Sequence, residues 1–515
     1  MRTAGGKASV SQRRWFLTLP WLWTLVSLAC IFVILNLERV HPHDFWWHVR
    51  AGQWILDNGR VPAVDLFSYT RAGQPWAYQS WLMEVVLYSL YRLGDLPLVI
   101  LFNSVVITAA YGLLLRVNQW AAAGDLRWAS LATVAAAALI LLNHVPRPQT
   151  ISVLLFVITL FLIERDARRT YREGPLLPGD RALWWLPLLF ALWANCHGGF
   201  IFGLALLGTY VLSRLLSWLR KRHPFPGLLA LVTVFTAAAT LLSPLGTGMV
   251  DYVLGFFRHP ITRTLNTEFW PPTVRTLDGV LFFGFSVLII VLLLASGHRL
   301  SPRESLRLLL FGGLALFARR NVTWFGIVAA PTLAACLVSL STKRRTGAKS
   351  PAVQRAGVPG INLAILLLVG LLTLLSLPWL RPYLPLQESK RAYVTPQTPV
   401  DAVAFLRTLP EPASGPRHVF HSETSGSYMT WAVPNVPVFI DTRIELYPEG
   451  QWRDYLALNG ARHDWQAILG HYGVDTLLLE RERQAPLIEA ATASPGWQQL
   501  YEDEQAVIIE RRENP

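Results

Sequence analysis

Uninterrupted apolar segments occupy most of the first 380 residues of the chain. The segments 15–37, 279–297 and 360–380 each run for about 20 residues without a charge, and a helix of that length crosses the roughly 30 Å hydrocarbon core of a bilayer. A β-barrel would instead show short segments of alternating polarity, so helices are predicted to cross the membrane. About 11 spans are expected, at 15–37, 97–115, 128–143, 149–163, 183–194, 200–217, 226–242, 279–297, 306–318, 322–340 and 360–380.

Composition and charge agree with a membrane protein. Hydrophobic residues make up 52% of the chain and charged residues only 15%, whereas soluble chains carry nearer a quarter charged residues. The net charge of +13 does not indicate a nucleic-acid partner, because the basic residues lie in short loops between spans. The first apolar segment is too long for a cleaved signal peptide. Cys30, Cys196 and Cys336 lie in or beside apolar segments, so no disulfide framework is predicted.

The basic loops predict the topology. With the N-terminus in the cytoplasm, every strongly basic short loop falls on the cytoplasmic side, as the positive-inside rule requires. An odd number of spans then places the loop 38–80 and the C-terminus outside. The short apolar segment 81–93, which carries Glu84, is interpreted as an interfacial or re-entrant helix, because counting it as a span would invert this pattern. The basic residues are Arg116, Arg127, Arg165, Arg168, Arg169, Arg172, Arg220, Lys221, Arg222, Arg299, Arg303, Lys343, Arg344, Arg345 and Lys349.

Polar residues in unusual places fall mostly on the predicted outer side. They are far apart in sequence but at a similar membrane depth, so a site at the outer interface would collect them. Glu84 of the segment 81–93 joins them as a candidate substrate-binding residue. The set on the outer side is Asp44, His48, Arg147, Asn195, His197, Asp251, Glu268, Arg319, Arg320 and Asn321.

The outer loop 38–80 opens with Asp44, followed by Phe45, Trp46 and Trp47. Apolar spacing predicts a helix on the membrane surface that ends at 57–59, with the tryptophans as interfacial anchors. Asp44 could be a solvated carboxylate or a helix cap. A carboxylate beside two tryptophans is partly desolvated, however, and desolvation raises its basicity, as a general base requires.

Two predicted outer hairpins carry further candidates. Asn195 and His197 lie at a polar hairpin tip, which either meets water or hydrogen-bonds a sugar or phosphate. Arg319 and Arg320 oppose the positive-inside bias, and arginine suits bidentate binding of phosphate. Arg147, between two prolines, is a second phosphate-binding candidate. Asp251 and Glu268, in the outer loop 243–278, are interpreted either as ligands or as solvated side chains.

The segment 395–515 differs in composition from the rest, being polar, of mixed charge and without a span. A linker is predicted at 382–394, after a transmembrane domain at 1–381. No glycine-rich phosphate loop is present, which argues against nucleotide binding. The segments 425–428 and 441–443 are interpreted as turn and strand-end residues or as an edge that faces an acceptor. A small α/β domain is predicted, with strands at 418–420, 436–440, 476–479 and 506–509 and helices at 400–409, 465–472 and 486–492.

Five motifs resemble those of uncharacterised bacterial membrane proteins with this layout, and the layout resembles the GT-C superfamily of membrane glycosyltransferases. The motifs are DFWWHVRAGQWIL, PRPQ, WANCHGGFIFG, SPLGTGM and FIDTRIELY. The resemblance implies a bacterial inner-membrane enzyme that uses a sugar on polyprenyl phosphate or diphosphate. It also implies that Asp44 matches the loop acid that contacts the acceptor. The loop 143–148 lacks the further carboxylate of the metal-dependent branch, and Glu268 matches the later loop acid only loosely, so no metal or other cofactor is expected.

The leading hypothesis is therefore an inverting, metal-independent glycosyltransferase. Asp44 would deprotonate or orient an acceptor hydroxyl, and Arg147, Arg319 or Arg320 would stabilise the departing lipid phosphate. Asp44 is expected to face a cavity shared with at least one of these arginines. The acceptor is a glycan, lipid or protein outside the cytoplasm. The alternative is a protein without enzymatic activity, either a transporter of lipid-linked glycans or a scaffold in envelope assembly.

Overall fold

The computed structural model describes residues 18–141, 145–173, 180–221, 224–258, 264–345, 358–387, 391–412 and 415–512. Of the predicted spans, the loop 143–148 and the basic loop residues, positions 15–17, 142–144, Arg222 and Lys349 lie outside these ranges. The helices up to residue 383 are α1 (Leu19–Leu37), α2 (Phe45–Asn58), α3 (Trp81–Ala121), α4 (Leu126–Leu141), α5 (Gln149–Glu173), η3 (Arg181–Trp184), α6 (Trp185–Cys196), α7 (Phe200–Leu219), α8 (Gly227–Ala239), α9 (Gly248–Arg258), η4 (Thr267–Phe269), α11 (Leu277–Ser296), α12 (Pro302–Phe317), η5 (Arg319–Asn321), α13 (Val322–Arg345), α14 (Pro359–Leu375) and η6 (Pro378–Tyr383).

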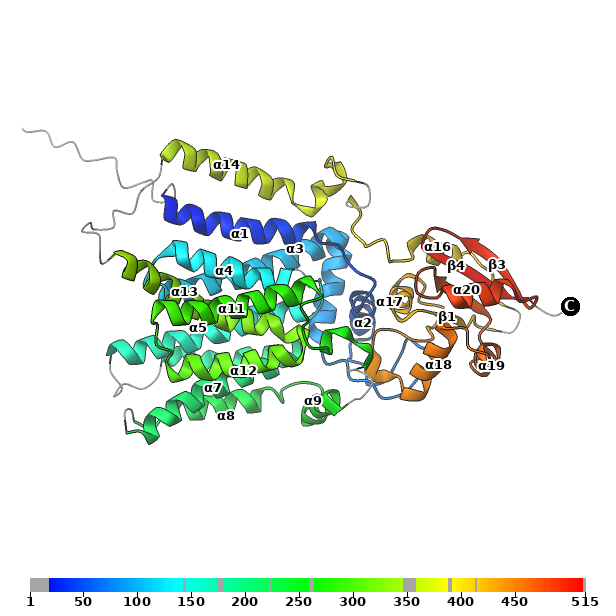
Figure 1. Ribbon diagram of the computed structural model, residues 1–515. Coiled ribbons are helices and arrows are strands. Elements are labelled where there is room, and N and C mark those ends of the chain that lie inside the picture. Colours follow the sequence, from blue (N-terminus) through cyan, green and yellow to red (C-terminus); the bar gives the residue numbers. More distant parts are fainter. Residues whose placement is uncertain are drawn as a thin grey trace, which may run out of the picture.

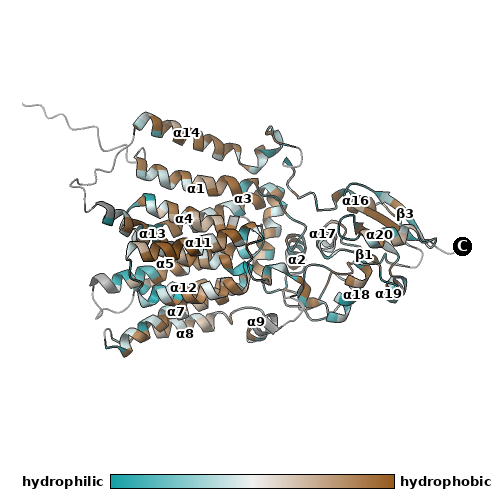
Figure 2. Ribbon diagram, viewed as in Figure 1, coloured by the Kyte–Doolittle hydropathy of each residue, from teal (hydrophilic) through white to brown (hydrophobic). Residues whose placement is uncertain are grey.

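Long apolar helices lie side by side in a bundle, and the ribbon in Figure 2 shows that hydrophobic residues predominate along them. Among the described residues, five segments are long and apolar enough to cross a membrane, so the chain is a multi-pass membrane protein. Each of the eleven predicted spans falls on a helix, while the number of crossings stays a prediction. The five segments are Leu19–Leu37, Trp81–Ala121, Phe200–Leu219, Leu277–Ser296 and Arg319–Lys343.

Helix α3 contains the ambiguous segment 81–93 and has a sharp kink. Gly94 and Asp95 are not helical, and Asp95 has a left-handed φ of 55°. After the kink the chain continues into the predicted span 97–115. Figure 1 shows that the first part of α3 lies across the end of the bundle, beside α2, while the second part runs along the bundle. This arrangement agrees with an interfacial segment.

Helix α13 lies in the middle of the bundle, packed against α3, α4, α11 and α12. Its residues Ala329, Ala330 and Ala334 are fully buried. Small side chains let neighbouring helices approach closely, which stabilises packing between helices inside a membrane. Helix α14 lies at the edge of the bundle and packs against α1 (Figure 1).

The C-terminal domain is a small α/β fold, as predicted. Its four-stranded sheet has the order β1-β2-β4-β3, with β1 and β2 parallel and the other pairs antiparallel. The predicted linker 382–394 lies between α14 and this domain. The elements are α16 (Val400–Leu406), β1 (Val419–His421), α17 (Glu423–Ala432), η7 (Ile444–Leu446), α18 (Glu449–Asn459), α19 (Trp465–His471), β2 (Thr476–Glu480), α20 (Ala485–Thr492), β3 (Trp497–Glu502) and β4 (Ala506–Arg511).

Some predictions for this domain are wrong. The segment 436–440 is not a strand, because Val438 makes only isolated bridges, to Val419 and to Ser68. The segment 425–428 is not a turn but lies within helix α17, which Ser422 caps by accepting from the backbone N–H of Ser425. Helix α18 and strand β3 were not predicted.

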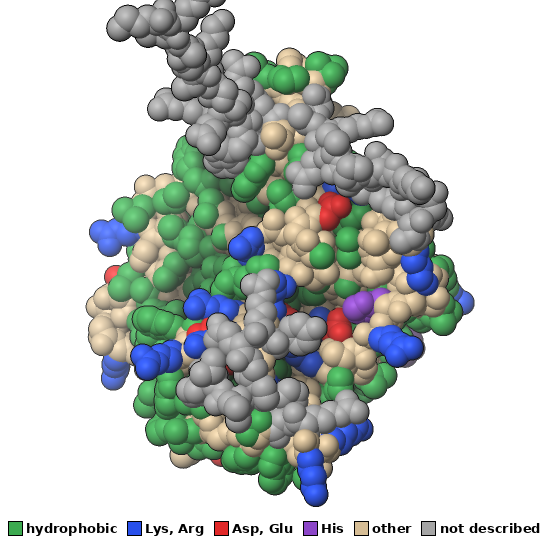
Figure 3. Space-filling view, turned by 90° about the vertical axis from the view of Figure 1, so that its left-hand side faces the viewer, with side chains coloured by type: hydrophobic (Ala, Val, Ile, Leu, Met, Phe, Trp, Pro, Cys, Tyr) green, Lys and Arg blue, Asp and Glu red, His purple; other side chains and the backbone are tan. Residues whose placement is uncertain are grey.

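The loop 38–80 and the C-terminal domain lie at the same end of the bundle (Figure 1). Figure 3 shows the opposite end, where Lys and Arg side chains gather around a hydrophobic surface. This separation agrees with the predicted topology, in which the basic end faces the cytoplasm.

Candidate functional site

A cavity of about 610 Å³ lies where the helical bundle meets the C-terminal domain. The loop 38–80, α3, the loops between spans and the segment 442–445 all contribute to its wall. Its polar lining residues include Glu38, His41, His43, Asp44, His48, Glu84, Arg147, His197, Asn266, Glu268, Arg319, Arg320, Asn321, Thr442, Arg443 and Glu445. Eight of the residues predicted from sequence to bind substrate, together with Asp44, therefore face one space.

Arg147 bridges two carboxylates in this cavity. Its Nη1 lies 3.0 Å from Asp44 Oδ2, and its Nη2 lies 2.7 Å from Glu268 Oε1. The side chain of Arg147 is only 11% exposed, compared with 28% for Asp44 and 37% for Glu268. Arg147 lowers the pKa of Glu268 below its ordinary value, against the effect of burial. The two carboxylates in turn raise the pKa of Arg147, although burial opposes this, so the cluster is ionised.

Asp44 is at the N-cap position of helix α2, but its side chain caps no backbone N–H. Burial raises the pKa of its carboxyl group, and the guanidinium of Arg147 is the largest of the effects that more than offset this, so the pKa lies below its ordinary value. The expected proximity of Asp44 to Arg147 is observed. The ion pair stabilises the carboxylate and offsets the rise in basicity expected from desolvation, as a resting pair with an arginine is predicted to do.

The two tryptophans after Asp44 are not interfacial anchors, contrary to the prediction. Trp46 is 3% exposed and Trp47 is 7% exposed. Trp46 packs edge-on against Tyr91 of α3 and Tyr428 of α17, so it lies between the bundle and the C-terminal domain. The same spacing of aromatic residues suits a lipid interface and a protein interface, and the covering domain is distant in sequence.

His48 follows Asp44 by one turn of α2, and its Nδ1 lies 3.0 Å from Glu84 Oε1. The side chains are 9% and 1% exposed, respectively. The two helices meet at Gly52, where a Cβ atom would lie 2.0 Å from the carbonyl oxygen of Glu84. Glycine therefore permits the close approach that brings the imidazole and the carboxylate together.

Arg319 and Arg320 contact different partners. Arg319 Nε lies 2.7 Å from Asp278 Oδ2 at the start of α11. Arg320 lies 4.8 Å from the ring centroid of Phe269, beside Glu268, and its charge helps to lower the pKa of that carboxyl group. Asn321 is buried and donates to the backbone oxygen of Leu314. All three line the cavity.

The hairpin between α6 and α7 contributes one of its two predicted residues to the cavity wall. His197 lines the cavity, with its Nδ1 2.9 Å from Ser152 Oγ, and burial lowers its pKa to about 3, so the ring is neutral. Asn195 does not line the cavity. It accepts from Trp81 Nε1 at 2.7 Å and donates to two backbone oxygens, contacts that account for it structurally. Asp251 is solvent-exposed.

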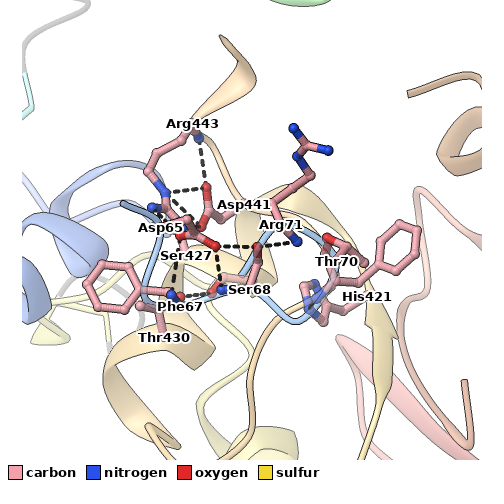
Figure 4. A network of polar contacts seen from close by, with 12 residues as sticks. Asp65, Phe67, Ser68, Thr70, Arg71, His421, Ser427, Thr430, Asp441 and Arg443 are labelled. Atoms are coloured by element: carbon pink, nitrogen blue, oxygen red, sulfur yellow. Dashed lines mark hydrogen bonds and ion pairs between the residues drawn. The ribbon is translucent and has the colours of Figure 1, made fainter. Parts of the chain in front are cut away.

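The C-terminal domain reaches the cavity through the segment 442–445, one of the two predicted acceptor-facing edges. Arg443 anchors this segment: its Nη1 lies 2.7 Å from Asp65 Oδ1 in the outer loop, and its Nη2 lies 2.5 Å from Asp441 Oδ2. All three side chains are fully buried. Figure 4 shows this network, in which Asp65 also accepts from Ser68. A buried charge needs such partners, so Arg443 links the domain to the loop.

Several residues of the wall were not singled out from sequence. Burial lowers the pKa of His41 to about 4 and also lowers that of His43, so both imidazoles are neutral. The HPHD pattern places both beside Asp44, and this proximity could have indicated them. In the part of the chain that the structure describes, no three His, Cys, Asp or Glu side chains form a group suited to a metal ion. Metal independence stays a prediction.

These features define a class of protein: a multi-pass membrane bundle with a charged cavity beneath a small α/β domain. The fold is similar to those of two solved membrane proteins, an oligosaccharyltransferase and ArnT. No family profile matches the sequence, and no curated protein does. Similarity is found among solved structures.

The oligosaccharyltransferase AglB from Archaeoglobus fulgidus, solved with an inhibitory peptide and a dolichol-phosphate, aligns with a TM-score of 0.56 and 13% identity over 91% of this chain and 70% of AglB. ArnT from Cupriavidus metallidurans, solved with undecaprenyl phosphate, aligns with a TM-score of 0.52 and 15% identity over 95% of this chain and 97% of ArnT. At these identities the likeness establishes the architecture.

Proposed function

We propose that this protein is a membrane glycosyltransferase that transfers a sugar from a polyprenyl-phosphate or polyprenyl-diphosphate donor to an extracytoplasmic acceptor. The observation that carries the proposal is Arg147, held between Asp44 and Glu268 in the cavity. A guanidinium group binds phosphate oxygens in bidentate fashion. Two solved proteins with this fold hold a dolichol-phosphate and undecaprenyl phosphate, which supports a lipid phosphate as the ligand.

The reaction follows from the charges. The donor phosphate binds Arg147, with Arg320 beside it, and displaces one of the two carboxylates. As the bond between the anomeric carbon and the phosphate oxygen breaks, negative charge develops on the phosphate, and fixed guanidinium groups stabilise it. Asp44, released from Arg147, deprotonates or orients the acceptor hydroxyl. Attack from the face opposite to the leaving phosphate inverts the anomeric carbon.

Arg147 also supports a reaction without a metal ion. Its guanidinium occupies the space between Asp44 and Glu268, where two carboxylates would otherwise attract a divalent cation. The cluster therefore already holds the positive charge that the leaving phosphate needs. The alternative function, a transporter or scaffold for lipid-linked glycans, would also need an arginine that binds phosphate. It would not need a carboxylate such as Asp44 beside that arginine.

Binding and product formation test the proposal. Undecaprenyl phosphate should bind the purified protein in lipid nanodiscs, and Arg147→Ala should weaken binding about 10- to 100-fold, since charge-assisted hydrogen bonds contribute about 1.5–3 kcal/mol. Arg275→Ala is the matched control, because Arg275 is exposed in the outer loop 243–278 and does not line the cavity. Mass spectrometry should show lipid-linked sugar accumulating in cells with Arg147→Ala. Equal binding by both variants, with an unchanged glycan pool, would refute the proposal.

A further inference from the structure

The buried pair of His48 and Glu84 lies in the cavity wall and is not needed to bind phosphate. Glu84 is 1% exposed, and its Oε2 has no hydrogen-bond partner among the described residues. His48 is therefore the one described side chain that hydrogen-bonds this carboxylate. A carboxylate at Nδ1 fixes the ring orientation and the tautomer, leaving the lone pair on Nε2. In the described part of the chain, Nε2 has no hydrogen-bond partner, and His48 lines the cavity.

From this geometry we infer that His48 is the general base of the transfer and that Glu84 is its positioning residue. The inference rests on the proposed function and deepens it, because a base of this kind implies an acceptor that is an alcohol: the hydroxyl group of a glycan or lipid. His48 Nε2 would accept a hydrogen bond from that hydroxyl. The rings of Trp47 and His48 contact each other at 3.6 Å between centroids, with their planes tilted by 34°, which further restricts the imidazole.

The reaction balances without another reagent. The acceptor oxygen forms a bond to the anomeric carbon while the bond from that carbon to the phosphate oxygen breaks. The electron pair of the broken bond stays on the lipid phosphate, at Arg147. The hydroxyl proton passes to His48 Nε2, and the imidazolium that forms is stabilised by Glu84. Release of the product returns the proton to water.

Asp44 is less suited to this step. Its carboxylate is paired with Arg147, and the pair lowers its pKa, which weakens it as a base. One turn separates Asp44 from His48 on the same helix, so both can contact one acceptor. Asp44 then orients the acceptor while His48 takes the proton.

Several other titratable and charged groups surround the pair of His48 and Glu84. Asp44 lies on the preceding turn and Glu84 on α3; Arg147 lies beside Asp44, and His197 faces from the turn between α6 and α7. Arg443 approaches from the C-terminal domain, 5.8 Å from the ring of Trp47. Substituting Glu84 removes the one negative charge in direct contact with the imidazole. The acidic limb of the pH–rate profile should therefore move to lower pH when Glu84 is replaced.

The test uses full-length protein in nanodiscs, incubated with membranes from cells that lack the protein. These membranes supply the accumulated donor and acceptor, and mass spectrometry follows the loss of lipid-linked sugar. His48→Asn should reduce the initial rate about 100-fold or more and abolish the acidic limb. Glu84→Gln should reduce the rate about 10- to 100-fold and move that limb to lower pH, because the imidazolium loses its counterion. Glu84→Asp should restore part of the rate.

Controls separate the possible failures. Binding of undecaprenyl phosphate should stay within about 2-fold of wild type in His48→Asn, whereas a folding defect would abolish it. His463→Asn, at an exposed position of the C-terminal domain, should leave rate and profile unchanged. If His48→Asn or His48→Gln keeps the acidic limb at near wild-type rate, the base is another group and the inference is overturned. If wild-type protein shows no transfer, the proposed function fails, and this inference with it.

Discussion

Replacing Arg443 by methionine should destabilise the junction between the outer loop and the C-terminal domain. Arg443 is the counterion of Asp65 and Asp441, and all three side chains are fully buried. Methionine is of similar length and keeps the contacts with Trp47, Phe67 and Trp76, whose rings surround the guanidinium. The substitution therefore removes the charge and little of the volume.

The expected loss follows from the burial of the two carboxylates. Removing one partner of a buried ion pair costs about 3–5 kcal/mol, because the remaining charge is left without compensation. For a domain of this size, roughly 3–5 °C in Tm correspond to each kcal/mol, so the apparent Tm of the domain should fall by roughly 10–25 °C.

Thermal unfolding in nanodiscs at one scan rate, followed by tryptophan fluorescence, measures this change. The triple variant Asp65→Asn, Asp441→Asn, Arg443→Met should recover part of the loss, because no buried charge remains. Arg453→Met is the control, since that side chain is 73% exposed on α18. An apparent Tm within about 3 °C of wild type for Arg443→Met, or a triple variant no more stable than the single one, would refute the reasoning.

Four further predictions address the site and the topology. Glu268→Gln should lower the apparent Tm at pH 7. The pKa of Glu268 is depressed in the folded state, so the difference should shrink as the pH falls below the unfolded pKa of a glutamate, about 4.3, and vanish once the folded carboxyl group is protonated. A difference that persists at low pH would argue against an ionic origin. Gly52→Ala should lower stability and transfer, since its Cβ would meet the backbone oxygen of Glu84 at 2.0 Å, while Gly208→Ala, with open space around it, should be tolerated; equal behaviour of the two variants would contradict the packing argument. Chelating agents should leave the transfer rate unchanged, and a loss that manganese or magnesium restores would contradict metal independence. In a cysteine-free background, Asn58→Cys and Glu489→Cys, at exposed positions, should both react with an impermeant reagent added to intact cells, and protection of either would overturn the predicted topology.

The membrane fold could be predicted because span length and loop charge are local properties of the chain. The shared cavity could be predicted in part, because loops at one membrane face are confined to similar depth. This confinement was enough to predict that Asp44 and Arg147 lie close together. The pairing of His48 with Glu84 was not predicted, since it depends on how closely α2 approaches α3. Burial of Trp46 was missed because its cover, Tyr428, lies almost 400 residues away.

Within the C-terminal domain, strands β2 and β4 were predicted because they are central and apolar, with both faces covered. The segment 436–440 has the same apolar character but pairs only at Val438, where the outer loop adds Ser68 on its other side. Local sequence does not distinguish these two cases, because strand formation depends on which neighbour supplies the hydrogen bonds.

The link between Asp65 and Arg443 also determines when the loop 38–80 can be covered during biosynthesis. The two residues are separated by 378 positions (443 − 65), and chain elongation at about 5–20 residues per second separates their synthesis by roughly 20–75 s. Throughout that interval the outer loop has its acid and its aromatic side chains but not the domain that covers them. A ribosome stalled before codon 441 would leave a complete set of membrane helices with an uncovered loop. With the predicted topology, the uncovered loop of such a nascent chain would be accessible to chaperones and proteases outside the cytoplasm.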